Sequence, residues 1–290
     1  MIISPEIIVS ILVLFLMWGG VLLYFKWVKA GQESEWGTDP MTGSMPRPPG
    51  ESLRIRLQSL QDELDEMLTI VIIAALAAGA APLLDITTPA KWTVAIMGIS
   101  IAVWNVRKFK ALRKERHNTR LGYKGERYVG QYLNDLAANG SKVYHDVPCR
   151  SNKQNFNIDH VVLGPAGVFV IETKARRKPK HIQGKSKAQV TYDGQRLAFP
   201  TFSDKYGLKQ AERNAAYLSE VLTSSTGMDV LAHPVLVLPG WYVKREGAGQ
   251  VRVLNPKGLA SALTGKKQLN EEQIARIDHQ LTQLTVCEDD

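Results

Sequence analysis

Hydrophobic residues are distributed very differently in the two parts of this chain. Up to about residue 106 they form long unbroken runs, whereas beyond that point they fall into short strand-like and amphipathic helix-like patterns. The first pattern suits the interior of a lipid bilayer, and the second is typical of a globular domain. We therefore expect membrane-spanning helices followed by an α/β domain.

Three apolar runs in the first part have the length of a transmembrane helix. Residues 7–25 contain no charged side chain, and residues 67–84 and 86–106 form two further runs separated by a short turn. A helix of about 20 residues crosses the roughly 30 Å hydrocarbon core of a bilayer. The sequence thus predicts a first anchor within residues 1–30 and a transmembrane helical hairpin over residues 67–106.

Each of these spans has an alternative interpretation. A cleaved signal peptide would begin with a basic segment, but Glu6 precedes the first run, and no small-residue cleavage site follows it. A buried hairpin of a soluble protein would have polar faces, but the second and third runs are apolar on all sides and rich in alanine, which suits close helix contact in lipid. Lys91 is the exception, and we expect it to reach the membrane interface beside Trp92.

Positive charges predict the orientation of the spans. Lys26 and Lys29 follow the first run and six basic residues lie between residues 107 and 116, whereas the loop between the second and third runs has almost none. Because Lys and Arg accumulate on the cytoplasmic side, we expect a bacterial inner-membrane protein with its N-terminus outside and its C-terminal domain in the cytoplasm. Residues 31–66 are then a cytoplasmic linker and entry helix, and residues 107–120 a basic connector.

The overall charge of the chain indicates an anionic binding partner. The formal net charge is +8 and the sequence pI is about 9.4, which suits either nucleic acid or an anionic lipid surface. The basic connector fits both partners. Cys149 and Cys287 match neither a zinc spacing nor a disulfide framework, so we expect two reduced thiols without a function.

Beyond the connector, helical and strand-like segments alternate. Residues 125–140 predict an amphipathic helix, and the wholly apolar residues 234–238 predict a buried strand. Between them the pattern indicates strands at 142–147, 157–163 and 168–173, a hairpin at 189–199 and a helix at 206–222, with two more helices between residues 254 and 285. This order predicts an α/β domain over residues 121–268, with a central mixed sheet flanked by helices, and a C-terminal helix within residues 269–290.

Charged residues interrupt two of the predicted apolar strands. Asp159 lies inside one strand, and Glu172 and Lys174 lie at the end of the next. Neighbouring hairpin strands can bring the two carboxylates to one edge, with the lysine on the same face. A carboxylate in an apolar strand needs a partner, and a hard cation such as Mg²⁺ (or Mn²⁺) is one. This combination suits phosphodiester hydrolysis, and the alternative is an exposed strand end with ordinary charges.

Five segments of this part resemble successive blocks of the nuclease-related domain (NERD) family. They are YKGERYVGQYLNDL, VYHDVPCRSNKQNFNIDHVVLGPAGVFVIETKAR, VTYDGQRLAFP, LKQAERNAAYL and PVLVLPGWYV, which together cover about residues 121–243. That family is assigned to the restriction-endonuclease-like PD-(D/E)xK fold, in which a helix carries the first acidic residue and a β-hairpin carries Asp and Glu-x-Lys. The resemblance implies Glu126, Asp159, Glu172 and Lys174 as catalytic residues, and the three carboxylates among them as metal ligands.

Several neighbouring residues are candidates for a supporting role. Gln210 and Asn214, one turn apart on the following helix, match a polar block of the family and could orient substrate or the lysine; a solvated helix face is the alternative. Arg176 and Arg177 begin a basic segment that could bind the substrate strand. His160 points to the opposite face from its neighbouring aspartate, so we expect a packed or surface histidine.

These observations predict a membrane-anchored, metal-dependent nuclease that hydrolyses phosphodiester bonds of DNA or RNA at the cytoplasmic face. A non-catalytic nucleic-acid-binding module on an inactive nuclease fold is the alternative, since nuclease folds also include inactive members. A third hypothesis is a scaffold whose domain binds a partner protein. The sequence favours the nuclease because all four core residues are present, and it leaves the type of nucleic acid, the mode of cleavage and the oligomeric state open.

Overall fold

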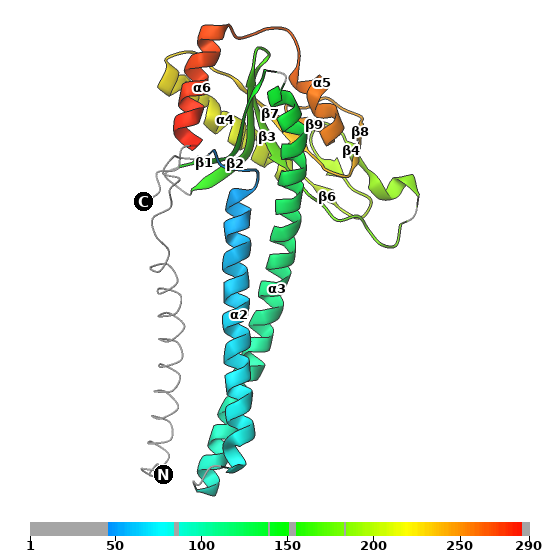
Figure 1. Ribbon diagram of the computed structural model, residues 1–290. Helices are drawn as coiled ribbons and strands as arrows, with labels where there is room; N and C mark the ends of the chain where they lie inside the picture. The colour runs from blue at the N-terminus through cyan, green and yellow to red at the C-terminus, as the bar shows by residue number, and fades with distance from the viewer. Residues whose placement is uncertain (1–45, 84–86, 139, 151–154, 183, 286–290) are drawn as a thin grey trace. The chain divides into compact units, whose positions relative to one another are not determined.

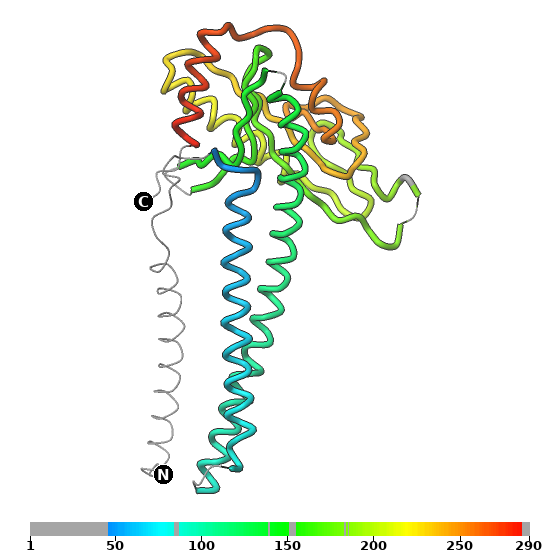
Figure 2. The backbone as a smooth tube through the Cα atoms, viewed as in Figure 1, coloured from blue at the N-terminus to red at the C-terminus, as the bar shows by residue number. Residues whose placement is uncertain are grey.

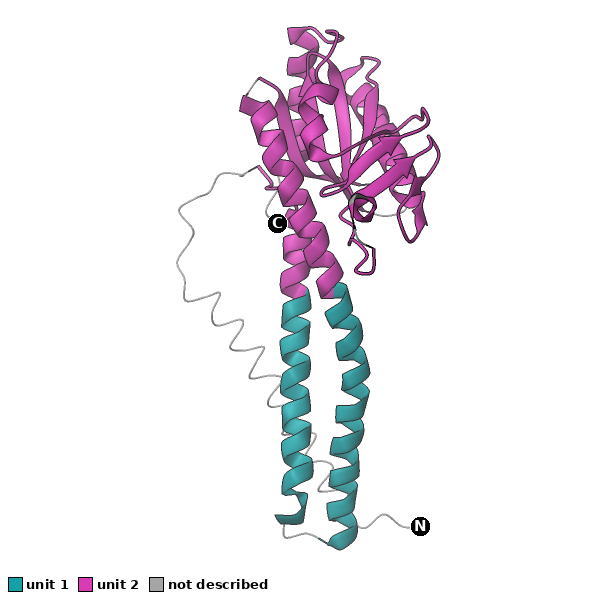
Figure 3. Cartoon of the chain, turned by 90° about the vertical axis from the view of Figure 1, so that its right-hand side faces the viewer, with its two compact units in different colours: residues 1–43, 60–115 teal, residues 44–59, 116–290 magenta. Residues whose placement is uncertain are grey.

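The computed structural model describes residues 46–83, 87–138, 140–150, 155–182 and 184–285 (Figure 1). These residues belong to two compact units, which Figure 3 shows in different colours. The helical unit includes Leu60–Glu115, and the second unit includes Ser44–Ser59 and Arg116–Asp290. Helices α2 (Glu51–Ala80) and α3 (Thr88–Ala138) each contribute residues to both units.

The helical unit is an antiparallel pair made of the larger part of α2, the short 3₁₀ helix η1 (Ala81–Leu83) and the first part of α3 (Figure 1). Small residues let the two helices approach closely. A Cβ atom added at Gly98 would lie 2.6 Å from the Ala74 carbonyl oxygen and 2.9 Å from Ala78 Cβ. Ala74 and Ala78 of α2 therefore lie close to α3, the kind of helix contact for which such small residues are suited.

Within the described residues, one helix is long and apolar enough to cross a membrane, where the sequence predicted two. It spans Glu51–Leu83, and its most apolar 18-residue stretch has a mean hydropathy of 2.0 with 17% of that stretch buried. The third predicted span, residues 86–106, does not qualify, because Lys91 and Asn105 lower the mean hydropathy of α3. The first predicted span, residues 7–25, lies outside the described residues together with the two lysines that follow it.

Segments that the sequence analysis treated separately form continuous helices. The predicted entry helix runs directly into the second apolar run as α2, and the third run, the basic connector and the first helix of the α/β domain together form the 51-residue α3. Neither helix has a proline in its interior, so the i→i−4 hydrogen bonds continue across the predicted boundaries. Lys91 Nζ donates to the Pro82 carbonyl oxygen at 3.2 Å, which places its charge beside the end of the preceding helix.

The second unit is built on a five-stranded mixed sheet with the order β1-β2-β3-β7-β9. Strands β1 to β3 are successively antiparallel, β7 pairs parallel with β3, and β9 pairs parallel with β7. The strands are β1 (Lys142–Cys149), β2 (Phe156–Gly164), β3 (Gly167–Thr173), β7 (Ala232–Val237) and β9 (Arg252–Leu254). The predicted mixed sheet is confirmed, and β9 is an additional strand that the sequence pattern did not indicate.

A second, four-stranded sheet has the order β6-β5-β4-β8 and was not predicted. It consists of β4 (Gln189–Tyr192), β5 (Leu197–Ala198), β6 (Ser203–Asp204) and β8 (Tyr242–Arg245), with the 3₁₀ helix η2 (Lys185–Ala188) before β4. The predicted hairpin around Asp193 and Gly194 is present as β4 and β5, and the glycine supplies the positive φ of 97° that the turn requires. The hairpin pairs in parallel with β8, not with the five-stranded sheet.

Helices cover both faces of the five-stranded sheet. Val168 and Val170 of β3 pack in one apolar core with α4 (Tyr206–Thr226) and α6 (Glu271–Thr285), which lie together on one side of the sheet in Figure 2. Phe169 and Ile171 pack in a second core with the last turns of α3 and with α5 (Leu259–Leu263), which follows η3 (Pro256–Gly258). Successive side chains of a strand point to opposite faces. The side chains of β3 that follow Ile171 therefore also alternate between the two faces of the sheet.

Candidate functional site

The two strand carboxylates lie beside each other at one end of β2 and β3. His160 pairs with Ile171, so the antiparallel register continued by one residue places Asp159 opposite Glu172. Asp159 Oδ2 accepts a hydrogen bond from the backbone N–H of Thr173 at 2.7 Å. Directly opposed residues project to the same face of a sheet. The predicted placement of these carboxylates on neighbouring strands is therefore confirmed.

The ammonium of Lys174 is held between strand and helix. Its Nζ atom lies 2.5 Å from Glu172 Oε1 and donates to Gln210 Oε1 of α4 at 3.0 Å. One turn further along α4, the buried Asn214 donates to the other oxygen of Glu172 at 3.0 Å. The solvated-face interpretation is thus wrong for Asn214. Of the two options considered for Gln210, this geometry favours orientation of the lysine.

Glycines permit the close packing around this lysine. A Cβ atom added at Gly207, in the first turn of α4, would lie 3.2 Å from Lys174 Cγ. On the other side, a Cβ atom at Gly125 of α3 would lie 2.8 Å from Ala175 Cβ. The close approach of α3 brings the buried side chain of Glu126, the next residue, towards the strand ends. Helix α3 thereby supplies the third predicted carboxylate.

One cavity of about 510 Å³ is lined by all seven predicted catalytic and substrate-binding residues. The predicted catalytic and substrate-binding residues that line it are Glu126, Asp159, Glu172, Lys174, Arg176, Arg177 and Gln210. The remaining lining residues are Leu53, Asn118, Leu121, Gly122, Thr173 and Ala175. Convergent polar groups in one concave site are typical of a binding or catalytic centre.

Burial and mutual repulsion disfavour the charged forms of the three carboxylates. Burial, followed by the charges of Asp146 and Glu172, raises the pKa of Glu126 to about 8. Burial, followed by the charges of Glu172 and Glu126, raises the pKa of Asp159, and Lys174 only partly opposes this. Burial also raises the pKa of Glu172, again against the effect of the lysine. When fully ionised, three carboxylates and one ammonium leave two negative charges, which a divalent cation or two protons would balance.

The lysine in this group remains charged. Burial acts to lower the pKa of Lys174, but the charges of Glu172 and Asp159 and the hydrogen bond to Glu172 outweigh it, so the pKa is raised. A lysine with a raised pKa is an ammonium at all physiological pH values. The cavity therefore contains a positive charge at a defined position.

The donor set suits a hard divalent cation, although the carboxylates do not form a ready-made ligand cluster. Across the described ranges, no group of three or more His, Cys, Asp or Glu side chains is arranged to hold a metal ion. Glu172 is engaged by Lys174 and Asn214, and Asp159 by a backbone N–H. Oxygen donors with excess negative charge are nevertheless what Mg²⁺ or Mn²⁺ prefers. Metal binding by Glu126, Asp159 and Glu172 stays a prediction.

Comparison with known protein families gives a match for this region. The family described as Nuclease-related domain, or NERD, matches residues 121–239. The α/β unit is similar to this family over the matched residues. No curated protein and no solved structure matched the chain. All seven predicted site residues lie within the matched range, whereas Leu53 and Asn118 contribute to the cavity from outside it.

The two arginines of the cavity are held by residues that carried no signal in the sequence. Arg176 Nη2 lies 2.7 Å from Asp204 Oδ2. Arg177 donates from Nη1 to Asn118 Oδ1 at 2.9 Å and from Nη2 to the carbonyl oxygen of His117 at 3.1 Å. Asn118 and His117 lie on α3, 59 and 60 residues earlier in the chain. These contacts fix both guanidinium groups at the cavity. They use only some of the five N–H donors of each arginine.

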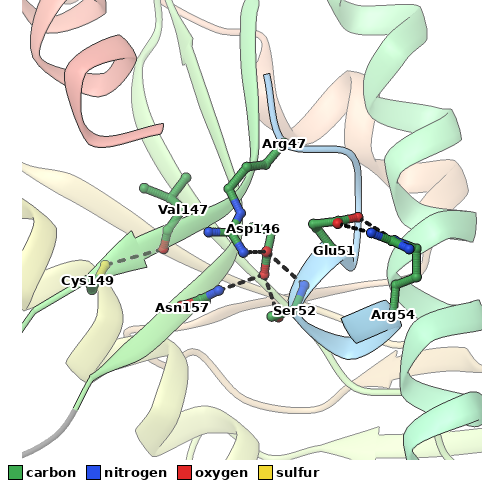
Figure 4. A network of polar contacts seen from close by, with 8 residues as sticks. All are labelled: Arg47, Glu51, Ser52, Arg54, Asp146, Val147, Cys149 and Asn157. Carbon is green, nitrogen blue, oxygen red and sulfur yellow. Dashed lines mark hydrogen bonds and ion pairs between the residues drawn. The ribbon is translucent and has the colours of Figure 1, made fainter. Parts of the chain in front are cut away.

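A polar network that the sequence did not reveal joins the start of α2 to β1 of the α/β unit (Figure 4). Its centre is Asp146, which is 1% exposed and has a φ of 48°, uncommon for a residue other than glycine. Its Oδ2 atom lies 2.7 Å from Arg47 Nη2 and accepts from the Ser52 N–H at 2.9 Å. Its Oδ1 atom accepts from Ser52 Oγ at 2.6 Å and from Asn157 Nδ2 at 2.9 Å. The aspartate therefore binds one of the free N–H groups at the helix start.

The segment held by Asp146 also forms part of the cavity. A Cβ atom added at Gly50, where φ is 75°, would lie 2.9 Å from Tyr123 Cδ2 and 3.4 Å from Glu126 Oε2. Leu53, in the first turn of α2, lines the cavity itself. The start of α2 thus packs directly against the side chain that α3 contributes to the site.

The remaining candidates of the sequence analysis are packed in the interior. Of the two options considered for His160, packed or at the surface, the structure shows the packed one, with its Nδ1 atom 2.9 Å from Nδ1 of His145. Burial, and then the nearby His145, lower the pKa of His160 well below its usual range, and burial lowers the pKa of His145 to about 4, so the pair is neutral. Cys149 is a buried free thiol whose pKa is raised by burial to about 12, as expected of an unreactive cysteine. Cys287 lies outside the described residues.

Proposed function

We propose that this protein is a metal-dependent nuclease that hydrolyses phosphodiester bonds of DNA or RNA. The observation that carries this proposal is the ammonium of Lys174, 2.5 Å from the Glu172 carboxylate in a cavity that also contains Asp159, Glu126 and two arginines. The match to the nuclease-related domain supports the same class of activity.

The basic side chains bind and polarise the substrate in this proposal. Arg176 and Arg177, at the cavity, bind phosphates of the nucleic-acid strand, because guanidinium groups pair well with phosphate oxygens. Lys174, held by Glu172 and Gln210, directs its N–H groups at the scissile phosphoryl group and offsets the negative charge that grows there in the transition state. Because the lysine is held before substrate arrives, little reorganisation is needed during the reaction.

The acidic side chains have a separate role. Glu126, Asp159 and Glu172 would hold Mg²⁺ or Mn²⁺, since a divalent cation balances the two negative charges that Lys174 leaves. When bound, such a cation supplies positive charge that polarises a phosphoryl oxygen. Asn214 keeps Glu172 in position from the helix side.

The purified full chain should cleave labelled DNA or RNA only when a divalent cation is present. We expect activity with Mg²⁺ or Mn²⁺ and its loss on adding EDTA, because in this proposal the cation supplies the positive charge that polarises a phosphoryl oxygen. Gel electrophoresis of single-stranded and double-stranded forms of both nucleic acids measures the products. Binding without cleavage of every form would support the non-catalytic binding module instead.

We also propose that the helical unit attaches the protein to a bacterial inner membrane with the NERD domain in the cytoplasm. The apolar stretch of α2 supports this, as do exposed apolar side chains on both helices, because large exposed apolar surfaces mark contacts with a membrane or a partner. These side chains are Leu68, Ile72, Leu76, Leu83, Trp92, Ile96, Ile99, Val103, Trp104 and Val106. Further along α3, the basic residues from Arg107 to Lys114 are exposed, as expected of the cytoplasmic end of a membrane helix.

Membrane attachment predicts that the full chain stays in the membrane pellet after extraction with alkaline carbonate, which removes proteins held only by charge. Protease added to the outside of intact cells should leave the NERD domain uncut. Immunoblotting of both fractions measures the result, with a cytosolic protein as the control for lysis. Release of the chain into the carbonate supernatant, or digestion of the domain from outside, would contradict this proposal.

A further inference from the structure

An exposed aromatic ring stands beside the lysine of the cavity. Tyr206 is the first residue of α4 and is 61% exposed. Lys174 Nζ lies 5.8 Å from the centroid of its ring, and the guanidinium carbon of Arg213 lies 5.9 Å from the same centroid. Two cations therefore lie over this ring, and the rest of its surface is open to solvent.

The start of α4 fixes this ring at the edge of the cavity. The backbone N–H of Tyr206 donates to Asp204 Oδ1 at 2.7 Å, while Oδ2 of the same aspartate pairs with Arg176, which lines the cavity. Gln210, four residues further along the helix, also lines the cavity and holds Lys174. Residues four apart share one face of a helix, so Tyr206 extends the polar wall of the site outwards.

A ring bordered by cations combines two features that bind single-stranded nucleic acid. The open face of an aromatic side chain stacks on an unpaired base, and nearby cations bind the phosphates on either side of it. A base inside a duplex has both faces covered by its neighbours and has to leave the stack before it can lie on a protein ring. Such a ring therefore discriminates between unpaired and paired substrates.

We propose that Tyr206 stacks on an unpaired base next to the phosphate that Lys174 contacts, so that the substrate is single-stranded or locally unpaired nucleic acid. This rests on the proposed function for the position of the scissile phosphate. The stacking itself is measurable without cleavage, because binding can be followed in EDTA.

Fluorescence anisotropy in EDTA tests the proposal. It measures how tightly the full chain binds a fluorescent oligothymidylate of 20 nucleotides. Y206A should weaken binding by about 5- to 100-fold, the range found when one stacking side chain is removed. Y206F and Y206W should bind as the wild type does, because both keep an aromatic face. Y242A is the matched control, since Tyr242 is 63% exposed but lies on β8 and is not among the cavity residues. Binding of a blunt duplex should change less than twofold in all four variants.

Strands with abasic sites separate stacking from a structural role of the ring. A strand without bases offers nothing to stack on, so Y206A should bind it as the wild type does. Equal weakening by Y206A on oligothymidylate, abasic strand and duplex would mean that the ring only positions Lys174, and this would overturn the proposal. No effect of Y206A, or no binding of any nucleic acid by the wild type, would overturn it as well. Selective loss of single-strand binding together with a wild type that cleaves nothing would support stacking and refute the nuclease.

Discussion

K174M should lower the rate of metal-dependent cleavage by about 100- to 1000-fold, the usual effect of removing one group that stabilises charge in a transition state. The methionine keeps the apolar stem that packs near Gly207 but removes the ammonium held by Glu172 and Gln210. K174A should lose at least as much activity. Single-turnover cleavage of a labelled strand at saturating enzyme measures the chemical step separately from binding.

Carboxylate variants should lose cleavage while they keep nucleic-acid binding. D159A and E172A should each abolish most cleavage, while nucleic-acid binding in low salt stays within a few-fold of the wild type. In the proposed function, Arg176 and Arg177 provide the affinity for phosphate, whereas the carboxylates hold the metal ion. E220Q, which removes an exposed carboxylate elsewhere on α4, serves as the matched control. Equal activity in the wild type and all variants would reveal a contaminating nuclease and contradict this assignment.

D146A should lower the free energy of unfolding by about 3–5 kcal/mol, the usual cost of removing one partner of a buried ion pair. The substitution takes the carboxylate away from Arg47, whose side chain is only 16% exposed, and from Ser52 and Asn157. Chemical denaturation of the full chain, followed by far-ultraviolet circular dichroism, measures the change. Activity should fall as well, because the segment held by Asp146 packs against the side chain of Glu126.

D146N provides the graded control for this prediction. Asparagine also tolerates a positive φ and can accept one hydrogen bond from Ser52, but it lacks the charge that pairs with Arg47. D146N should therefore lower the free energy of unfolding by less than D146A does. The double variant R47M/D146N should lose less free energy of unfolding than the two single variants together, because each single variant already breaks the ion pair. A D146A protein within 1 kcal/mol of the wild type would show that the network contributes little.

The cavity extends beyond the region that resembles the NERD family, and the Asp146 network holds the additional segment in place. Arg47, Ser52 and Leu53 precede the matched residues 121–239, and Leu53 is part of the cavity wall. The same short segment begins α2, the helix with the membrane-length apolar stretch. The start of this helix and the proposed metal site therefore depend on common contacts within the α/β unit.

The sequence by itself determined those parts of the protein that depend on local patterns. Short apolar, strand-like segments located β1, β2, β3 and β7, and the amphipathic period located α4. Charges inside two apolar strands indicated Asp159, Glu172 and Lys174, because a hairpin connects these strands and fixes which residues oppose each other. Glu126 had no such local pattern, and only the family resemblance pointed to it.

The tertiary structure alone decided the features that join distant segments. Asp146 and Ser52 are 94 residues apart, and Arg177 and Asn118 are 59 apart, so no local periodicity predicts that they meet. The parallel pairing of β4 with β8 likewise joins remote segments and forms the unpredicted second sheet. The same holds for the cavity itself. Seven of its side chains could be named from the sequence, but their convergence depends on where α3, α4 and the start of α2 pack against the strand ends. Local patterns specify elements, and the packing of those elements specifies the site.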